Sequence, residues 1–426
     1  MPHGPAYPFA GDERPPICWE RPDGGVVGFW PREWLDFLGE AVLRVTDRYD
    51  WEVWQPDYRA DRIYSHRLDT GVTHRLFPAE DRVYRPGIKR QRGMCSPSML
   101  STLRESEHDP IVVMLYTTFG FRTPFYTEIL TSSGSPRAFP IFFRSGGMFR
   151  APISELLEVH RPLTYIDLLV EHVRLKRLLR RYGVDVISEQ SDSALREVRK
   201  IYRGRVERLT MGCDFDFWTP AASREERQAT RVRLRIGREK LVFFASGNFI
   251  PRKQLDRLLE VFHRIENRDD FFLIIAGHGD EGYTGRLHSL AEPLVRQGKA
   301  MIHPFVTGEG LRDLYRISDI YASVATDEGG PVSVMKAMAC GIPILSTPVG
   351  ETAGRLKRHG AGRVIPLRRY DKWVTAVCGI LDGDVPQALD IATARQVYHW
   401  PHVARRFIDV FDDLLTLSHM NKRQRS

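Results

Sequence analysis

The second half of the chain alternates short apolar segments with longer amphipathic ones, and this alternation limits the folds open to it. Segments such as LVFFAS (241–246) and FFLIIAG (271–277) have the length of buried strands, and each precedes a stretch with helical spacing of its apolar residues. Glycine-rich loops separate the two kinds of segment. This order is typical of a parallel sheet covered by helices, and ligands of such doubly wound sheets bind at the carboxyl ends of the strands. We therefore predict an α/β domain with a doubly wound sheet.

The first half shows a less regular version of the same pattern. Five segments read as strands, and they are 51–55, 72–77, 111–116, 138–143 and 184–188. Helical spacing covers 34–45 and 153–181, and a turn with Gly24 and Gly25 leads toward the first of these helices. The first half is therefore predicted to be a second α/β domain.

The composition of the chain limits the class of protein to which it can belong. No apolar segment approaches the roughly 18 residues of a membrane-spanning helix, and the opening MPHGPAYPFAGDERPP has no apolar core, unlike a signal peptide. The five cysteines lie far apart without metal-ligand spacing, so neither a disulfide framework nor a metal site is predicted. These features predict a cytoplasmic protein. The net charge of +8 favours anionic partners, among which nucleotides, phospholipid surfaces and nucleic acid stay open.

The stretch TDEGGPVSVMKAMACGIP (326–343) is the first candidate site. Pro331 suits the first position of a helix, and Gly341 suits its end, so Gly329 and Gly330 lie at a helix N-terminus. Free amides there attract phosphate or sugar oxygens, and Glu328 can accept hydrogen bonds from sugar hydroxyls. An ordinary capped turn with a solvated acid would show the same residues.

The stretch SGNFIPRKQLDRLLEVF (246–262) is the second candidate site. Gly247 ends a predicted strand, and Arg252 and Lys253 stand where the following helix begins. Two cations at such a place can neutralise a diphosphate without a metal. Both stretches belong to one predicted sheet, so each strengthens the interpretation of the other as part of a binding site.

The chain resembles the retaining glycosyltransferases of family 4, also called glycosyl transferase group 1. The similarity runs from about 205 to 415 and is carried by segments that follow the family's order: SGNFIPRKQLDRLLEVF, FFLIIAGHGDE, LRDLYRISDIYAS, DEGGPVSVMKAMACGIPILSTPVGE and GAGRVIPL. It implies the GT-B fold, in which two Rossmann-like domains face each other across a cleft and the last helix returns to the first domain. The expected domains are the acceptor-side domain 1–215, the donor domain 216–398, and the returning helix with a basic tail, 399–426.

The resemblance implies a role for individual residues. Lys253, helped by Arg252, is expected to hold the donor's diphosphate as it leaves, and Glu328 to hold the donor sugar. Further donor contacts are expected from Gly247, Asn248, Gly277, Gly279, Gly329, Gly330, Val332, Ser333 and Lys336, with Gly277 and Gly279 beside the nucleoside. The candidates on the acceptor and phosphate side are Gly24, Gly25 and Arg144. No cofactor and no metal are expected besides the nucleoside diphosphate sugar.

Three positions depart from the family pattern. Lys336 replaces a second glutamate that is expected to bind ribose hydroxyls, Asn248 replaces an arginine after the strand glycine, and Arg144 replaces a frequent histidine. A lysine only donates hydrogen bonds, whereas a carboxylate accepts them. An unusual donor, a contact from Lys336 to a phosphate, an impaired enzyme, and a Lys336 that simply reaches solvent all stay open.

The favoured function is transfer of a sugar from a nucleoside diphosphate to a saccharide or lipid-linked acceptor, with retention, in cell-surface polysaccharide or glycoconjugate synthesis. The alternative is a GT-B protein that binds a nucleotide sugar, or pairs with an active transferase, without catalysis. The basic stretch 172–183 suits either an anionic membrane surface at the inner face or a solvated helix face. Nucleic-acid binding is not expected, because no accompanying motif is present.

Overall fold

The computed structural model describes residues 15–29, 31, 34–84, 91–106, 110–117, 140–145, 184–304, 306–326, 328–366 and 369–423. The predicted helix at 153–181 and the basic stretch at 172–183 lie outside these residues, so the membrane-surface contact stays a prediction. Two compact units make up the protein: Met1–Leu209 with Trp400–Ser426, and Thr210–His399.

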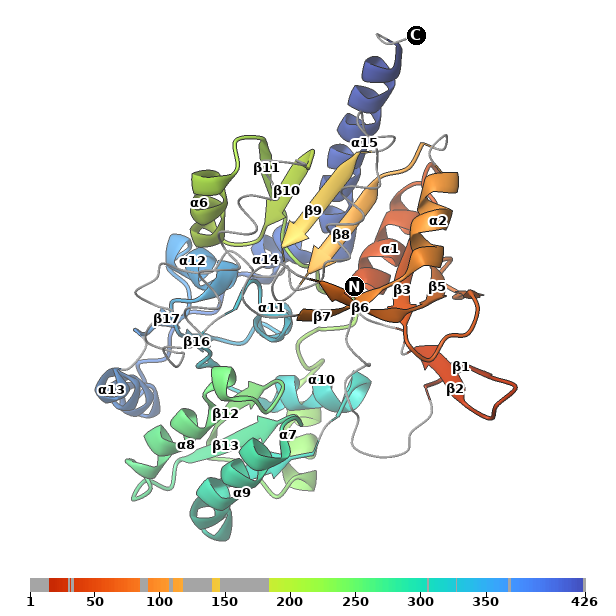
Figure 1. Ribbon diagram of the computed structural model, residues 1–426. Coiled ribbons are helices and arrows are strands. Elements are labelled where there is room, and N and C mark those ends of the chain that lie inside the picture. The colour runs from red at the N-terminus through yellow and green to blue at the C-terminus, as the bar shows by residue number, and fades with distance from the viewer. Residues whose placement is uncertain are drawn as a thin grey trace. The chain divides into compact units, whose positions relative to one another are not determined.

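The second unit is built around a six-stranded sheet in which all neighbouring strands run parallel. Its strands, in order across the sheet, are β14 (Ala300–His303), β13 (Phe271–Ala276), β12 (Leu241–Ser246), β15 (Ile320–Ser323), β16 (Ile344–Ser346) and β17 (Arg363–Val364). Strands β14, β13 and β12 follow one another backwards along the chain, and β15, β16 and β17 continue forwards on the other side of β12. This reversal confirms the predicted doubly wound sheet. Figure 1 shows the helices that surround it.

The helices of this unit follow the predicted amphipathic stretches. They are α7 (Arg224–Arg233), the short 3-10 helix η1 (Pro251–Lys253), α8 (Leu255–His263), α9 (Glu281–Arg296), α10 (Gly308–Ile317), α11 (Val332–Ala339), α12 (Gly350–Arg358), α13 (Tyr370–Leu381) and α14 (Ile391–Tyr398).

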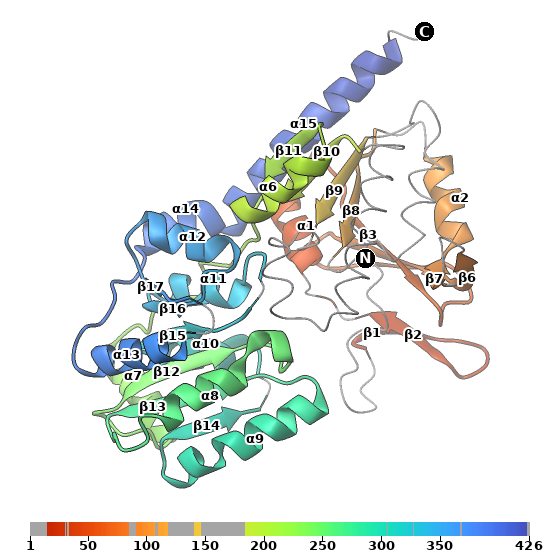
Figure 2. The same ribbon diagram turned by 60° about the vertical axis from the view of Figure 1, so that its left-hand side comes forward.

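Both faces of this sheet are covered by helices, as neighbouring residues of β12 show. The Phe243 ring packs on Phe262 of α8 at 5.1 Å between centroids, and the Phe244 ring packs on Tyr315 of α10 at 4.9 Å. Successive strand residues point to opposite faces, so an unbroken apolar strand requires apolar cover on both sides. Figure 2 shows α8 and α9 over one face of the sheet.

The first unit contains a parallel sheet and several smaller pieces. Its helices are α1 (Trp34–Val45), α2 (Pro97–Glu105), α6 (Asp192–Ile201) and α15 (Trp400–Arg423). The parallel sheet has the order β11 (Arg205–Arg208), β10 (Val186–Glu189), β9 (Ile141–Ser145) and β8 (Val113–Thr117). The smaller pieces are the hairpins β1 (Ile17–Glu20) with β2 (Val26–Phe29) and β6 (Glu80–Tyr84) with β7 (Gln91–Cys95), and the sheet of β3 (Glu52–Asp57), β5 (Thr73–Pro78) and β4 (Tyr64–Arg67).

All five strands predicted in the first half are present, but they do not share one sheet. The segments predicted at 51–55 and 72–77 form β3 and β5, which pair with β4 apart from the parallel sheet of β8 to β11. The pattern of apolar residues identifies a strand but says nothing about its pairing partner. Pairing is decided by contacts between distant segments.

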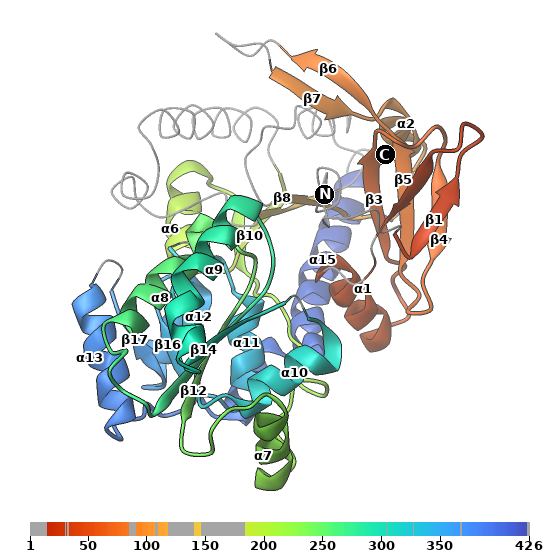
Figure 3. The same ribbon diagram turned by 90° about the horizontal axis from the view of Figure 1, so that it is seen from below.

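The last helix, α15, belongs to the first unit, as the resemblance implied. Rings of Phe407 and Phe411 pack on Phe142 of β9 with centroids 5.9 and 5.7 Å apart. Helix α15 also packs along α1, and Figure 3 shows the two side by side. Within the described part of the chain, none of the helices combines the length and apolar character needed to cross a membrane.

Candidate functional site

Arg252 and Lys253 lie in the turn that follows β12, at the carboxyl edge of the sheet. They form η1, and Gln254 closes it with a left-handed backbone (φ 48°), which few residues other than glycine adopt readily. The Lys253 side chain lies against Gly247, since a Cβ on Gly247 would be in van der Waals contact with Lys253 Cε at 3.4 Å. The turn therefore presents two cations in a fixed position.

Glu328 meets both of these cations. Arg252 Nη1 donates to Glu328 Oε1 at 3.1 Å, and Lys253 Nζ donates to the same oxygen. The side chains of Glu328 and Lys253 are 10% and 17% exposed, so the group is partly shielded from water. The three residues expected to carry the chemistry are thus brought together from two loops 75 residues apart in the chain.

The loop that carries Glu328 is fixed by its backbone at both ends. The Thr326 N–H donates to Arg252 O at 2.9 Å, and the Glu351 N–H donates to Gly329 O at 2.8 Å. Gly350 has a φ of 76°, and a Cβ there would lie 3.2 Å from the carbonyl oxygens of both Glu328 and Gly329. The sequence reasoning missed Thr326, Gly350 and Glu351; the glycine in TPVGE was the available signal.

Glu351 itself is held by a buried network. It is 3% exposed and accepts hydrogen bonds from the Arg355 Nη2 at 2.7 Å and from the Tyr398 hydroxyl. These bonds fix the start of α12 behind the Glu328 loop.

Helix α11 begins directly after the glycine pair. Pro331 is the cap residue and Val332 the first helical residue, so Pro331 lies one position earlier than predicted. The N–H groups of Val332 and Ser333 belong to the first turn, which has no preceding helical carbonyl for them. They make this edge of the sheet suited to an anionic ligand.

Gly277 and Gly279 pack against the neighbouring loop. A Cβ on Gly277, whose φ is 156°, would lie 2.0 Å from Gly247 O, and one on Gly279 would lie 2.5 Å from Phe249 O. The Phe249 N–H donates to His278 O at 2.7 Å, which extends the pairing of β12 and β13 past the strands. The predicted contact of these glycines with a nucleoside stays a prediction, but close packing of two backbones already requires them.

Lys336 points toward an aromatic ring instead of toward a carboxylate. Its Nζ lies 4.3 Å from the centroid of Trp218, and no ion pair of Lys336 with a carboxylate is found among the described residues. Burial lowers the pKa of Lys336, while the neighbouring thiols of Cys213 and Cys340 act in the opposite direction. No local pattern in the sequence identifies Trp218 as the partner, and donor binding by Lys336 stays a prediction.

The lowered pKa of Lys336 predicts a pH dependence of stability. Below the folded-state pKa the buried ammonium disfavours the folded state, and this disappears as the pH rises from that pKa toward the ordinary value of 10.5. We expect wild type to gain free energy of unfolding relative to Lys336→Met as the pH rises toward 10.5, measured by urea denaturation. An unchanged difference between the two proteins would contradict this.

The candidates of the first unit have different surroundings. Gly24, with a φ of 82°, and Gly25 close the hairpin of β1 and β2, so a strand separates them from α1. Arg144 is fully buried; its Nη1 donates to Leu209 O at 2.9 Å, and its guanidinium lies over the rings of Trp34 and Phe407. Their acceptor-side roles stay predictions. Asn248 lies in the loop after Gly247, where its carbonyl accepts from the Ile250 N–H.

One group of side chains in the described residues has the composition of a metal site: Asp214, Asp216 and His399. Its ligand atoms already have partners, since Asp216 Oδ1 accepts from Arg395 at 2.5 Å and His399 Nδ1 from the Phe215 N–H at 3.3 Å. A cation would have to compete with Arg395, so this group carries no functional assignment.

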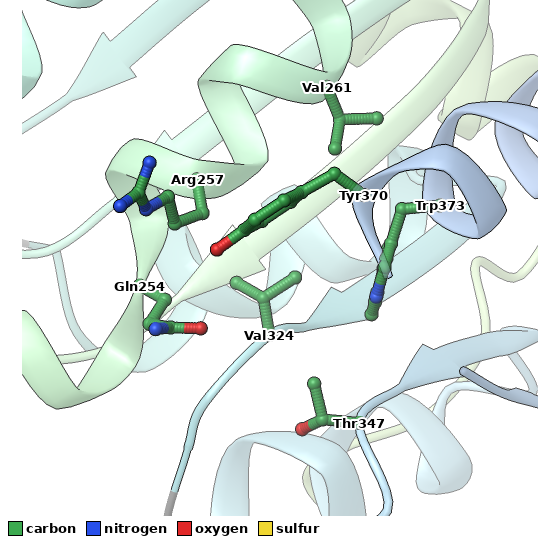
Figure 4. A pocket seen from close by; sticks show the side chains of 7 residues that line it. All are labelled: Gln254, Arg257, Val261, Val324, Thr347, Tyr370 and Trp373. Atoms are coloured by element: carbon green, nitrogen blue, oxygen red, sulfur yellow. The ribbon is translucent and has the colours of Figure 1, made fainter. Parts of the chain in front are cut away.

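A small pocket lies next to the candidate site, beside the residues that follow β15 and β16 (Figure 4). The Arg257 guanidinium lies 5.5 Å from the centroid of Tyr370 and pairs with Glu260. The residues that line it are Gln254, Arg257, Val261, Val324, Thr347, Tyr370 and Trp373. The predicted site residues do not line it, and only Gln254 connects it to the Lys253 turn.

The second unit matches a family of known proteins. The family model of glycosyl transferases group 1 matches residues 226–394, which include both loops of the candidate site and the whole of the six-stranded sheet.

Curated relatives match about half of the chain. A D-inositol 3-phosphate glycosyltransferase of Jonesia denitrificans is 24% identical over 250 residues, which cover 54% of this chain and 59% of the relative. A GDP-mannose-dependent monoacylated alpha-(1-6)-phosphatidylinositol monomannoside mannosyltransferase of Corynebacterium glutamicum is 27% identical over 232 residues, covering 52% and 59%. The matches thus span less than two thirds of either relative.

Solved structures resemble nearly the whole chain. Sucrose-phosphate synthase from Thermosynechococcus elongatus has a TM-score of 0.67 at 14% identity, covering 90% of this chain and 93% of that one. Anabaena Alr3699/HepE in complex with UDP-glucose has a TM-score of 0.63 at 14% identity, covering 90% and 97%. These likenesses confirm the predicted GT-B fold.

Proposed function

We propose that this chain, whose residues 226–394 match the family model of glycosyl transferases group 1, moves a sugar from a nucleoside diphosphate sugar to an acceptor with retention of anomeric configuration. The acceptor in this proposal is a saccharide or a lipid-linked acceptor, and the setting is synthesis of a cell-surface polysaccharide or glycoconjugate. The relatives named for inositol phosphate and for a phosphatidylinositol mannoside fit this setting, and the HepE complex with UDP-glucose fits a nucleotide sugar donor.

The convergence of Arg252, Lys253 and Glu328 is the observation that carries the proposal. They lie at the carboxyl edge of a parallel sheet, where ligands of such sheets bind, and the first turn of α11 adds backbone N–H groups. Cations and amides suit the diphosphate, and a carboxylate suits the hydroxyls of the sugar attached to it.

The chemistry follows from where charge develops. When the bond between the anomeric carbon and the phosphate oxygen breaks, its electron pair leaves with the diphosphate, and the anomeric carbon becomes more positive. Fixed cations and helix amides that face the diphosphate stabilise this separation of charge, as donors of an oxyanion hole do. In this proposal Lys253 and Arg252 supply the neutralisation, so we expect chelation of divalent cations to leave the transfer rate unchanged.

Thermal unfolding across a panel of nucleoside diphosphates and nucleotide sugars tests donor binding. A ligand present at 100 times its dissociation constant adds about 2.7 kcal/mol to the free energy of unfolding, so the matching donor is expected to raise the melting temperature visibly. A panel without any shift would contradict the proposal. The measurement is repeated with EDTA, and the same shift is expected because the phosphate contacts come from side chains and amides.

The alternative, a protein that binds the donor without transferring the sugar, rests on the departures from the family pattern at Lys336 and Arg144. Both functions predict a shift with one donor. They separate when that donor is incubated with candidate acceptors and the release of nucleoside diphosphate is followed: only a transferase shows release that depends on the acceptor.

A further inference from the structure

The two cations proposed to hold the diphosphate already have an anionic partner in the protein. A single oxygen, Glu328 Oε1, accepts from both Arg252 Nη1 and Lys253 Nζ. Phosphate oxygens and carboxylate oxygens use the same N–H donors of arginine and lysine. The carboxylate therefore takes one N–H of each cation, and a diphosphate that approaches the same N–H groups competes with it for them.

The carboxylate has few places to go when it is displaced. The Glu328 side chain is 10% exposed, and its loop is held by the hydrogen bonds from Thr326 and Glu351 to the neighbouring backbone. Arg252 and Lys253 are the partners of its side chain in the described residues. After displacement it would lie beside an anionic phosphate, and an incompletely solvated carboxylate without hydrogen-bond donors is unfavourable.

We propose that Glu328 acts as an internal competitor for the diphosphate and thereby makes the site select a nucleotide sugar over a bare nucleoside diphosphate. This inference rests on the proposed function. The sugar hydroxyls of the nucleotide sugar replace the N–H groups that Glu328 loses as hydrogen-bond partners. A nucleoside diphosphate offers no such hydroxyls at this position. The product of transfer is therefore held less tightly than the substrate.

The test is Glu328→Gln, studied by isothermal titration calorimetry with UDP and GDP. The amide keeps the size of the side chain but removes the charge that competes with the phosphates. We expect the variant to bind the matching nucleoside diphosphate about tenfold more tightly, which corresponds to about 1.4 kcal/mol. The matching nucleoside alone, uridine or guanosine, should bind equally to both proteins, because it does not reach the cations.

The nucleotide sugar is expected to respond differently. For UDP-glucose or GDP-mannose, loss of the hydroxyl contacts offsets the gain at the phosphates, so the preference for the nucleotide sugar over the nucleoside diphosphate falls by about tenfold. Glu292→Gln is the matched control, since it makes the same change of charge in an exposed ion pair with Arg296 on α9. It should leave the affinities unchanged.

The possible outcomes distinguish a failure of this inference from a failure of the proposed function. If wild type binds UDP or GDP and Glu328→Gln binds it equally or more weakly, while thermal unfolding shows the variant folded, the competition does not exist. A similar gain in Glu292→Gln would show that net charge alone is responsible and would also overturn the inference. If wild type binds none of the nucleoside diphosphates or nucleotide sugars of the panel, the proposed function fails and this inference fails with it.

Discussion

Replacing Lys253 with alanine is expected to lower the rate of sugar transfer by about 10²- to 10³-fold, the range seen when one donor to a developing negative charge is removed. The physical reason is that the Lys253 side chain, which lies against Gly247, is 17% exposed and the Arg252 side chain 30%, so Lys253 is the cation better shielded from water. Steady-state kinetics with the donor found in the binding panel would measure the change.

Two measurements make the result specific to Lys253. Lys357→Ala removes an exposed lysine of α12 in the same unit and should leave the rate unchanged. The melting temperature of Lys253→Ala should stay close to that of wild type, because the lysine's partner Glu328 keeps Arg252. Full transfer by a folded Lys253→Ala protein would remove Lys253 from the diphosphate site.

Replacing Gly277 with alanine is expected to lower the free energy of unfolding by about 3 to 5 kcal/mol, at the upper end of the effects of overpacking and backbone strain. The new Cβ would lie 2.0 Å from Gly247 O, a backbone atom that can move only with the Lys253 turn. Urea denaturation measures the loss.

The control for this change is Gly285→Ala on α9. Gly285 is exposed within a helix, and a Cβ there meets no atom within 4 Å. Alanine is favoured over glycine in a helix interior by about 1 kcal/mol, so this variant should be more stable than wild type. Equal stability of the two variants would mean that the loops around Gly277 adjust without loss.

The local elements of the second unit follow from the sequence because their signals are local. Buried parallel strands such as LVFFAS need apolar residues on both faces, and amphipathic helices need a period of 3.6 residues. Both patterns can be read within a dozen residues. The approximate positions of the main site residues could also be predicted locally. Arg252, Lys253 and Glu328 each lie beside the end of a predicted strand or the start of a predicted helix.

Side-chain partners could not be read in this way. The sequence left a phosphate or solvent open for Lys336, and the structure places it over Trp218, which is 118 residues earlier in the chain. Arg144 was an acceptor-side candidate and proves to be buried between Trp34 and Phe407. Which residues meet across such separations depends on how the elements pack, and packing has no local signature.

The sequence by itself determined the order of strands and helices, the carboxyl-edge position of the two candidate loops, and the family resemblance that joined them. Only the tertiary structure decided that Glu328 shares one oxygen between Arg252 and Lys253, and that Gly350 and Gly277 are required by neighbouring backbones. The reason is physical: propensity and periodicity act along the chain, whereas hydrogen bonds and close packing join residues that are distant in it.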